Sequence, residues 1–256
     1  MKILITNDDG IDSKGLHILA REMEKENEVI VAAPSSQRSA CSHSITIHDP
    51  LFIKEMKVEG INSRIYSVSG TPADCVKIGI EKLADGNVDM VLSGINYGLN
   101  IGTDVIYSGT VSAAVEGAIY KIPAMAVSMD TNNSEEALMQ GAKYANYILK
   151  TVFANHIKKD MVININMPER LEEGIEGLKI CQLGNRIYTT CYIETMAKEG
   201  RIAYELNSMP LDEEVENTDV YFIKKRFITI TPLHYDLTNF KVLKDVEKWF
   251  STKKFK

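Results

Sequence analysis

Two acidic residues stand side by side near the start of the chain, in the segment MKILITNDDG. Asp8 and Asp9 follow a short apolar run, with Asn7 before them and Gly10 after them. Adjacent carboxylates raise each other's pKa unless a cation relieves their repulsion. Because hard oxygen ligands suit Mg²⁺, Mn²⁺ or Ca²⁺ better than Zn²⁺, the pair predicts a divalent-metal site. For the pair alone, a surface turn or a helix cap is the simpler interpretation.

A glycine-rich segment, SGINYGLNIGTDVIYSGTVSAAVEGA at 93–118, is the second candidate for chemistry. Its glycines let the backbone approach a ligand closely. Ser108 or Thr110 can cap the helix that follows, and the amides at a helix N-terminus favour an anion such as phosphate. The segment matches neither GxGxxG nor GxxxxGK[ST], so taken alone it is equally compatible with an ordinary structural loop.

Strands and helices alternate through the first two thirds of the chain. The sequence predicts strands over 2–6, 28–34, 64–68, 88–94, 123–129 and 161–167. It predicts helices over 14–25, from the capping sequence Thr71-Pro72-Ala73-Asp74 onward, and over 110–121 and 135–151. Because several strands are almost wholly apolar, we expect parallel pairing with helices on both faces. The predicted fold is α/β, a three-layer Rossmann-like arrangement around a mostly parallel sheet.

The last third of the chain has a different pattern. The pieces RIYTTCYI and VYFIKKRFITI favour strands, and polar stretches separate them. We therefore expect β-hairpins attached to the core rather than further βαβ units. The predicted organisation is a catalytic core over 1–184, a β-hairpin oligomerisation arm over 185–232, and a C-terminal return over 233–256. This return should include a closing helix at 240–250.

Fold topology brings the two candidate segments together. In open α/β sheets, ligands bind at the carboxyl ends of the strands. The Asp8–Asp9 pair, the loop from Ser35, the SGTP segment at 69–72 and the SGIN segment at 93–96 all follow predicted strands. We therefore expect them at one edge of the sheet, where carboxylates for a metal and a helix N-terminus for an anion describe a phosphoryl site.

Composition limits the classes of partner. The 256-residue chain has a formal net charge of −6, which argues against a protein that wraps a polyanion. No apolar stretch is long enough to span a bilayer, so no membrane partner is expected. The apolar run at the N-terminus is too short for a signal peptide, and the expected location is cytoplasmic.

Several ordered motifs together resemble the survival protein SurE family of nucleotidases. These are NDDG after the first strand, APSSQRSACSHSIT at 33–46, SGTPADCV at 69–76, the glycine-rich segment at 93–118, and TPLHYDLTN at 231–239. The resemblance runs from Met1 to about residue 170 and returns at 229–239. The segment 171–228 carries little of it, and its role stays open.

The resemblance implies a metal-dependent phosphatase acting on nucleoside 5′- and 3′-monophosphates. By motif, the implied metal ligands are Asp8, Asp9, Ser39 and Asn96, and Asp8 and Asp9 are also the implied catalytic residues. The implied phosphate-binding residues are Asn96, Ser108, Gly109 and Thr110. The chain departs from the family pattern at Ala40, because a glycine commonly follows the motif serine there.

The resemblance also implies a cofactor and partners. The cofactor would be one divalent ion, Mg²⁺ or Mn²⁺, with Ca²⁺ as another occupant. Short oligonucleotides and polyphosphate are further substrate classes. A domain-swapped homodimer or homotetramer is expected, in line with the exposed strand edges of the predicted arm. Ile106, Tyr97 and Tyr107 lie near the predicted site, where stacking of a base and ordinary packing are both open.

These residues leave three interpretations open, two catalytic mechanisms and one binding function. In the first, a bound metal offsets charge on the phosphate while Asp8 or Asp9 holds the attacking water. In the second, an aspartate is itself the nucleophile, although such phosphatases resemble a DxD pattern rather than adjacent aspartates. In the third, the chain is a nucleotide-binding module without catalysis, which leaves the adjacent carboxylates unexplained.

Overall fold

A computed structural model gives the structure of the chain. It describes residues 1–256 except 131–133, 155–158, 169–170, 172–173, 199–200 and 252–256. In chain order, the core elements up to the fourth helix are β1 (Lys2–Thr6), α1 (Lys14–Met23), β2 (Glu28–Pro34), β3 (Ile53–Met56), β4 (Arg64–Val68), α2 (Pro72–Ile78), η1 (Gly79–Leu83), β5 (Met90–Tyr97), η2 (Gly102–Ile106), α3 (Gly109–Ile119), β6 (Ala124–Met129) and α4 (Glu135–Ala154). The remaining elements are β7 (Val162–Met167), β8 (Gly177–Ile180), β9 (Arg186–Lys198), β10 (Arg201–Asp212), α5 (Asp219–Lys224), β11 (Phe227–Leu233) and α6 (Phe240–Ser251).

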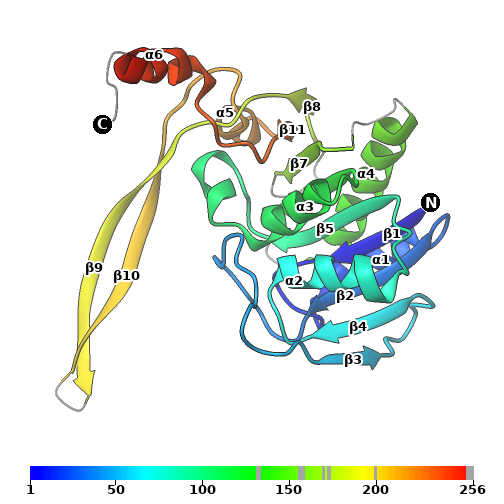
Figure 1. Cartoon of the computed structure of the whole chain (residues 1–256). Coiled ribbons are helices and arrows are strands. Elements are labelled where there is room, and N and C mark those ends of the chain that lie inside the picture. Colours follow the sequence, from blue (N-terminus) through cyan, green and yellow to red (C-terminus); the bar gives the residue numbers. More distant parts are fainter. Residues whose placement is uncertain (131–133, 155–158, 169–170, 172–173, 199–200, 252–256) are drawn as a thin grey trace.

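Within the described residues, the core is a 9-stranded sheet with the order β3-β4-β2-β1-β5-β6-β7-β11-β8 (Figure 1). The strands from β4 to β7 run parallel, and β1 lies between β2 and β5 with Ile3 opposite Val29 and Met90. At the two sides of this parallel block, β3 pairs antiparallel with β4 and β11 pairs antiparallel with β7. The mostly parallel sheet expected from the apolar strands is therefore confirmed.

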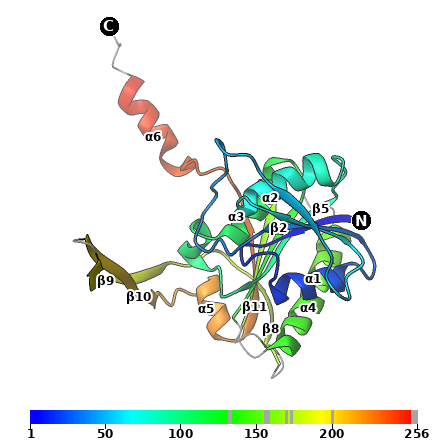
Figure 2. The ribbon, with the colours of Figure 1, turned by 90° about the horizontal axis from the view of Figure 1, so that it is seen from below.

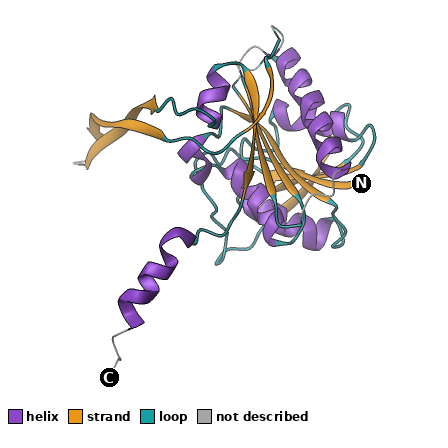
Figure 3. Ribbon diagram, turned by 90° about the horizontal axis from the view of Figure 1, so that it is seen from above, coloured by secondary structure: helices purple, strands orange, loops and turns teal. Residues whose placement is uncertain are grey.

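Helices cover both faces of the sheet (Figure 3). Residues alternate between the faces along a strand, so Ile3 and Ile5 pack with α1 and α4 while Leu4 packs with α2 and α3. All three of these β1 side chains are fully buried. The three-layer α/β architecture thus follows from apolar strands that are covered on both sides.

Local signals explain where α2 begins. Thr71 accepts a hydrogen bond from the Asp74 amide at 3.1 Å, and the Asp74 carboxylate accepts one from the Thr71 amide at 2.9 Å. Pro72 follows the cap at the first helical position. This is the capping box that the sequence predicts.

The expectation of hairpins throughout 185–232 is wrong in its second half. The β9–β10 hairpin, which pairs Arg186 with Asp212 at its base, projects from the core (Figure 1). The piece VYFIKKRFITI, however, forms part of helix α5 and then strand β11 in the core sheet. Thr218 caps α5 by accepting a hydrogen bond from the Tyr221 amide at 3.2 Å, a signal that outweighs the β-branched and aromatic composition of this piece.

The expected C-terminal helix is present as α6, but in this single chain it does not close on the core. It projects away from the sheet, and none of its residues is buried (Figure 2). Its apolar side chains include Trp249, which is 65% exposed. An amphipathic helix gains most of its stability from packing, so α6 has an apolar face without a cover within this chain.

Candidate active site

The turn after β1 presents the two aspartates. The Asn7 side chain closes this turn by donating a hydrogen bond to the Gly10 carbonyl at 3.0 Å and accepting one from the Gly10 amide at 3.2 Å. Gly10 has a φ of +99°, and a Cβ there would lie 3.2 Å from the Ser36 carbonyl carbon. The turn therefore requires glycine at its end, and the wholly buried Asn7 fixes its shape.

The Asp8 carboxylate lies against the start of α3. It accepts a hydrogen bond from the Thr110 hydroxyl, and a Cβ on Gly109 would lie 2.9 Å from its Oδ2 atom. Burial raises the pKa of Asp8, whereas hydrogen bonds from the Thr110 side chain and from the backbone of Thr110 and Gly109 lower it; the net shift is upward. Gly109 and Thr110, which the resemblance assigns to phosphate, thus contact Asp8 itself.

The Asp9 carboxylate points toward the end of β5. Its Oδ2 atom accepts a hydrogen bond from the Tyr97 amide at 3.2 Å. Burial, together with the charge of the adjacent Asp8, raises the pKa of Asp9 to about 6. Asp9 is half-buried while Asp8 is 5% exposed, so Asp9 is the carboxylate that solvent and a ligand reach more easily.

Asn96 immediately precedes Tyr97, the residue whose amide bonds Asp9, on β5. Its amide nitrogen donates a hydrogen bond to the Gly98 carbonyl at 2.8 Å. This bond fixes the side chain and leaves the carbonyl oxygen as its ligating atom. Close packing positions this end of β5, because a Cβ on Gly94 would lie 2.4 Å from the Val127 carbonyl oxygen and one on Gly15 would lie 2.4 Å from the Ile95 carbonyl oxygen.

Ser39 lies on the exposed loop that follows β2. The next-door Arg38 amide donates a hydrogen bond to the Asp8 carbonyl at 2.7 Å, and the Ser39 hydroxyl accepts one from the Gln37 side chain at 2.9 Å. Ala40 has a φ of +53°, in the left-handed region where glycine is favoured. The turn that a family glycine usually provides is therefore made here by alanine.

The loop over 35–48, which we call the strap, is fastened at several points. The Ser42 amide donates to the Tyr107 carbonyl at 3.0 Å, and the Thr46 amide donates to the Asp74 carboxylate at 3.0 Å. His43 Nε2 lies 2.6 Å from the buried carboxylate of Glu116 on α3. The strap is thus held at the start of α2 through Asp74, at the loop before α3 through Tyr107, and in the C-terminal half of α3 through Glu116. Its Asp8 end is Arg38, the neighbour of Ser39.

The loop before α3 is anchored to the base of the hairpin. The buried Asp219 carboxylate accepts hydrogen bonds from the Gly102 amide at 2.9 Å and the Gly184 amide at 2.7 Å. Asp104 contacts both Arg186, at 3.1 Å, and the Tyr188 hydroxyl, at 2.7 Å. This loop then leads to Ser108, whose buried hydroxyl caps α3 by accepting from the Val111 amide at 3.1 Å.

Sequence reasoning missed several residues that build this edge of the sheet. They are Asn7 as the residue that shapes the turn, Arg38, His43 and Glu116 at the strap, and Asp104, Arg186 and Asp219 at the hairpin base. Asn7 had a usable signal, because asparagine often bonds the backbone of its own turn. The contacts of Glu116 and Asp219 join segments far apart in the chain, so no local pattern indicates them.

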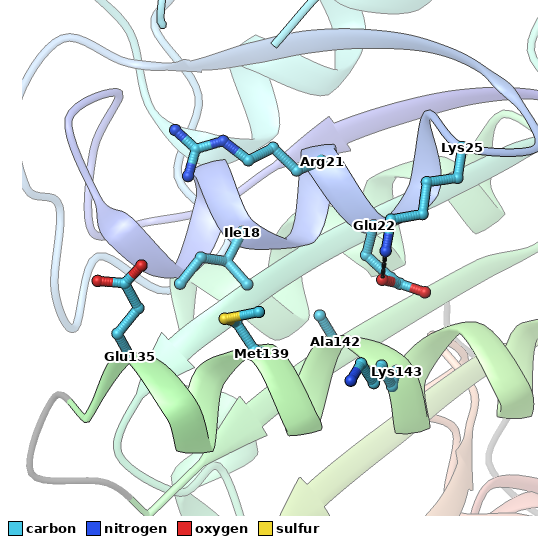
Figure 4. Close-up of a pocket in the computed structure, with 8 residues that line it drawn as sticks. All are labelled: Ile18, Arg21, Glu22, Lys25, Glu135, Met139, Ala142 and Lys143. Carbon is cyan, nitrogen blue, oxygen red and sulfur yellow. Dashed lines mark hydrogen bonds and ion pairs between the residues drawn. The ribbon is translucent and has the colours of Figure 1, made fainter. Parts of the chain in front are cut away.

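A charged pocket lies elsewhere, between α1 and α4 on one face of the sheet (Figure 4). Its lining includes the Glu22–Lys25 ion pair at 2.5 Å, together with Met139 and Lys143. None of the predicted site residues lines it. The pocket is therefore separate from the acidic site at the carboxyl ends of the strands.

The chemistry of the predicted donors, two carboxylates, a hydroxyl and an amide oxygen, suits a hard divalent cation. Among the residues that the structure describes, no group of three or more His, Cys, Asp or Glu side chains could hold a metal. The carboxylates among these donors are Asp8 and Asp9. Burial raises the pKa of both, so the charged carboxylates would be stabilised by a nearby cation. Two carboxylates completed by a hydroxyl and an amide oxygen are typical of Mg²⁺, Mn²⁺ or Ca²⁺.

Fold and site together define an α/β protein with an acidic centre at the carboxyl edge of a parallel sheet, beside the N-terminus of a helix. The family model described as "Survival protein SurE" matches residues 3–190. The chain belongs to the SurE family, as its motifs indicate.

Relatives match along nearly the whole chain. The protein named 5′-nucleotidase SurE from Clostridium tetani is 49% identical over 250 residues, covering 98% of this chain and 100% of the relative. A protein of the same name from Clostridium botulinum (strain Loch Maree / Type A3) is 49% identical, covering 98% of this chain and 99% of the relative. The crystal structure of the Sure protein from Aquifex aeolicus has a TM-score of 0.84 and 34% identity, covering 97% of this chain and 99% of that chain.

No helix in the described part of the chain has the length and apolar character needed to cross a membrane.

Proposed function

We propose that this protein is a divalent-metal-dependent phosphomonoesterase that hydrolyses nucleoside 5′- and 3′-monophosphates to nucleoside and phosphate. The observation that carries the proposal is the adjacent, partly desolvated Asp8–Asp9 pair against the start of α3. The name 5′-nucleotidase of the clostridial relatives supports the reaction class. Mg²⁺ or Mn²⁺ is the proposed cofactor, and Ca²⁺ is an alternative occupant.

The residues that would hold the metal are Asp8, Asp9, Ser39 and Asn96. When bound, the ion supplies a Lewis acid that offsets the charge developing on the phosphate oxygens. Asp8 is fixed by Thr110 and by the amides that begin α3, so it is already oriented before a ligand arrives. Such preorganisation is what makes an electrostatic contribution to catalysis large.

Asp9 is the better placed of the two carboxylates to hold the attacking water. It is more exposed than Asp8, and its contact with the Tyr97 amide engages Oδ2. Asn96, which precedes the Tyr97 that bonds Asp9, and the Ser108–Thr110 turn, which bonds Asp8, are the proposed contacts for the phosphate oxygens. The phosphate oxygens would approach the positive N-terminal end of α3, where the Asp8 carboxylate is also bound.

Phosphate release from AMP tests this function. Metal-stripped protein is expected to be inactive, and addition of Mg²⁺ or Mn²⁺ is expected to restore release. Asp9→Ala should lose the restored activity, whereas Asp12→Ala, which removes an exposed carboxylate from the same loop, should keep it. Activity that needs no metal, or that survives in Asp9→Ala, would contradict the proposal. Parallel assays with a nucleoside 3′-monophosphate, a short oligonucleotide and polyphosphate define the substrate range.

The alternative mechanism, with an aspartate nucleophile, predicts a covalent acyl-phosphate. The geometry disfavours Asp8 as this nucleophile, because Asp8 is 5% exposed and hydrogen-bonded to Thr110, so this route would use Asp9. Reductive trapping during turnover separates the routes, since only an acyl-phosphate is converted to homoserine at the nucleophilic position. A non-catalytic nucleotide-binding module would instead bind AMP and release neither nucleoside nor phosphate.

We also propose that the chain assembles as a homodimer or homotetramer through its arm and C-terminal helix. The hairpin exposes Tyr192, Ile202 and Met209 at 64%, 64% and 70%, and α6 has no buried residue. Apolar surface of this kind is typical of a face covered by another chain. Light scattering across a dilution series is expected to give a dimer or tetramer mass, and a monomer at every concentration would contradict the proposal.

A further inference from the structure

Two exposed apolar side chains lie directly before α3. Ile106 is 67% exposed and Tyr107 is 61% exposed, whereas the next residue, Ser108, is buried. Large apolar groups in water forgo the free energy that burial provides. These two consecutive exposed residues, directly before the Ser108–Thr110 turn of the proposed phosphate site, are therefore suited to contact an apolar part of the same ligand.

The backbone beneath these side chains is held on both sides. The Ser42 hydroxyl donates a hydrogen bond to the Ile106 carbonyl at 2.8 Å, and the Ser42 amide donates to the Tyr107 carbonyl at 3.0 Å. On the other side, the Tyr107 amide donates to the Asp104 carbonyl at 3.0 Å. The two side chains thus protrude from a fixed segment, so little ordering of the backbone is needed when a ligand binds.

Tyr97 has a different environment, although it is equally near the site in sequence. Its hydroxyl accepts a hydrogen bond from the Gly15 amide at 2.9 Å, and its backbone amide donates to Asp9. It is half-buried and packs against the core on the α1 side of the sheet. Tyr97 is therefore a structural residue of β5, and Tyr107 is the aromatic side chain that faces outward.

We propose that Tyr107, with Ile106 beside it, is the surface on which the base of a nucleoside monophosphate stacks. This inference rests on the function proposed above. Tyr107 is two residues from Gly109, a separation of at most about 7 Å along the chain, which the ribose of a nucleotide can span. Stacking on an aromatic ring tolerates every base, because every base has a π face. The site should therefore favour nucleotides over simple sugar phosphates without strong selection among bases.

The test compares AMP with ribose 5-phosphate, which has the same phosphate and sugar but no base. In Tyr107→Ala the KM for AMP is expected to rise about tenfold, because stacking contributes about equally to the bound substrate and the transition state. The ratio of kcat/KM for AMP to kcat/KM for ribose 5-phosphate should fall by the same factor. Tyr107→Phe keeps the ring and should keep the ratio.

Tyr147→Ala is the matched control, because Tyr147 is 60% exposed on the distant helix α4. It should match the wild type on both substrates. An unchanged ratio in Tyr107→Ala would overturn the inference while phosphate release from AMP in the wild type upheld the proposed function. Equal losses on both substrates, together with a smaller mass in light scattering, would assign Tyr107 to a subunit interface and also overturn it. A wild type that hydrolyses neither substrate would refute the proposed function, and the stacking surface with it.

Discussion

The carboxyl edge of the core sheet and the β9–β10 hairpin both end in solvent, but they hold their residues in different ways. At the sheet edge, Asp8 and Asp9 each bond to a distant segment of the same chain, and the Asn96 side chain bonds to the Gly98 carbonyl two residues further on. Along the hairpin, large side chains such as Tyr192 and Met209 remain mostly exposed. The edge is thus organised by contacts within the chain, whereas large side chains of the arm stay exposed in the described part of the chain.

The base of the hairpin, unlike its distal part, is bonded to the core. Arg186 and Tyr188 on β9 bond to Asp104. Asp219 accepts hydrogen bonds both from Gly184, just before β9, and from Gly102 in the loop before α3. The Asp104 carbonyl in turn accepts hydrogen bonds from the Tyr107 and Ser108 amides at 3.0 and 3.1 Å. The part of the arm that touches the core therefore supports the loop before α3, and the distal part carries the exposed side chains on which the proposed assembly rests.

Removing the charge at the sheet edge should have the largest effect. Asp8→Asn and Asp8→Ala are expected to lower kcat for AMP by about a thousandfold, because each removes a preorganised carboxylate. The mass from light scattering should not change, since Asp8 follows β1 in the core sheet, whereas β9, β10 and α6 project from the core (Figure 1). Steady-state kinetics beside circular dichroism checks both points. A folded variant with near-normal turnover would remove Asp8 from the mechanism.

Asp219→Ala should break the connection between hairpin base and core. The change leaves the buried amides of Gly102 and Val220 and the partly buried amide of Gly184 without their acceptor, at a cost of about 3 kcal/mol in unfolding free energy. Urea unfolding measures the loss. Asp245→Ala on exposed α6 is the control and should change stability by less than about 0.5 kcal/mol. Equal stability of the two variants would show that the hairpin base is not an integral part of the core.

Glu116→Gln should weaken the attachment of the strap in a pH-dependent way. Burial alone would raise the pKa of Glu116, but His43 and Lys77 outweigh it and hold the value below the ordinary 4.5. A carboxyl with a lowered folded pKa stabilises the fold above its unfolded pKa, and this stability is lost as pH falls through the folded pKa.

The wild type should therefore be more stable than Glu116→Gln by about 1–2 kcal/mol at pH 7. The gap should narrow as pH falls below 4.5, the ordinary value. Urea unfolding across this range measures it, with Glu55→Gln on exposed β3 as a control that should show no such gap. A gap that widens toward low pH would contradict the assigned role of Glu116.

Ala40→Gly should have the smallest effect. A non-glycine residue in the left-handed region costs about 1–2 kcal/mol, whereas glycine adds conformational entropy to the unfolded chain worth about 0.4–1 kcal/mol. With a φ of +53° at Ala40, the net gain in stability should be about 1 kcal/mol or less. Thermal unfolding of the two proteins measures it. A clear loss of stability would mean that the alanine methyl group has a packing role in the strap.

The sequence predicts the elements of the parallel core well because their signals are local. Apolar runs such as EVIVAAP and the Thr71–Asp74 capping box need no tertiary information. The sequence does not predict the helix after residue 212, because VYFIK has a strand-like composition but forms part of α5 through the cap at Thr218. The position of α6 was also out of reach, since an apolar helix face indicates packing but not the chain that supplies it.

For the candidate site, the pattern of the residues indicates their types but not their partners. The pair Asp8–Asp9 is evident from adjacency, yet the contact of Asp8 with Thr110 spans 102 residues of sequence. Tyr97 and Tyr107 are two tyrosines of the same glycine-rich segment, but their environments differ. The Tyr97 hydroxyl bonds the Gly15 amide, whereas the Tyr107 side chain is exposed. Such distinctions depend on tertiary contacts, which a single sequence does not specify.

Calorimetric titration of metal-free protein with Mn²⁺ tests the central claim most directly, because it detects the proposed metal site without relying on turnover. The wild type and Asp12→Asn should bind one ion per chain, and Asp9→Asn should bind it far more weakly while keeping the same circular dichroism spectrum. Equal binding in Asp9→Asn, or no binding in the wild type, would contradict a divalent-metal centre at the carboxyl edge of the sheet.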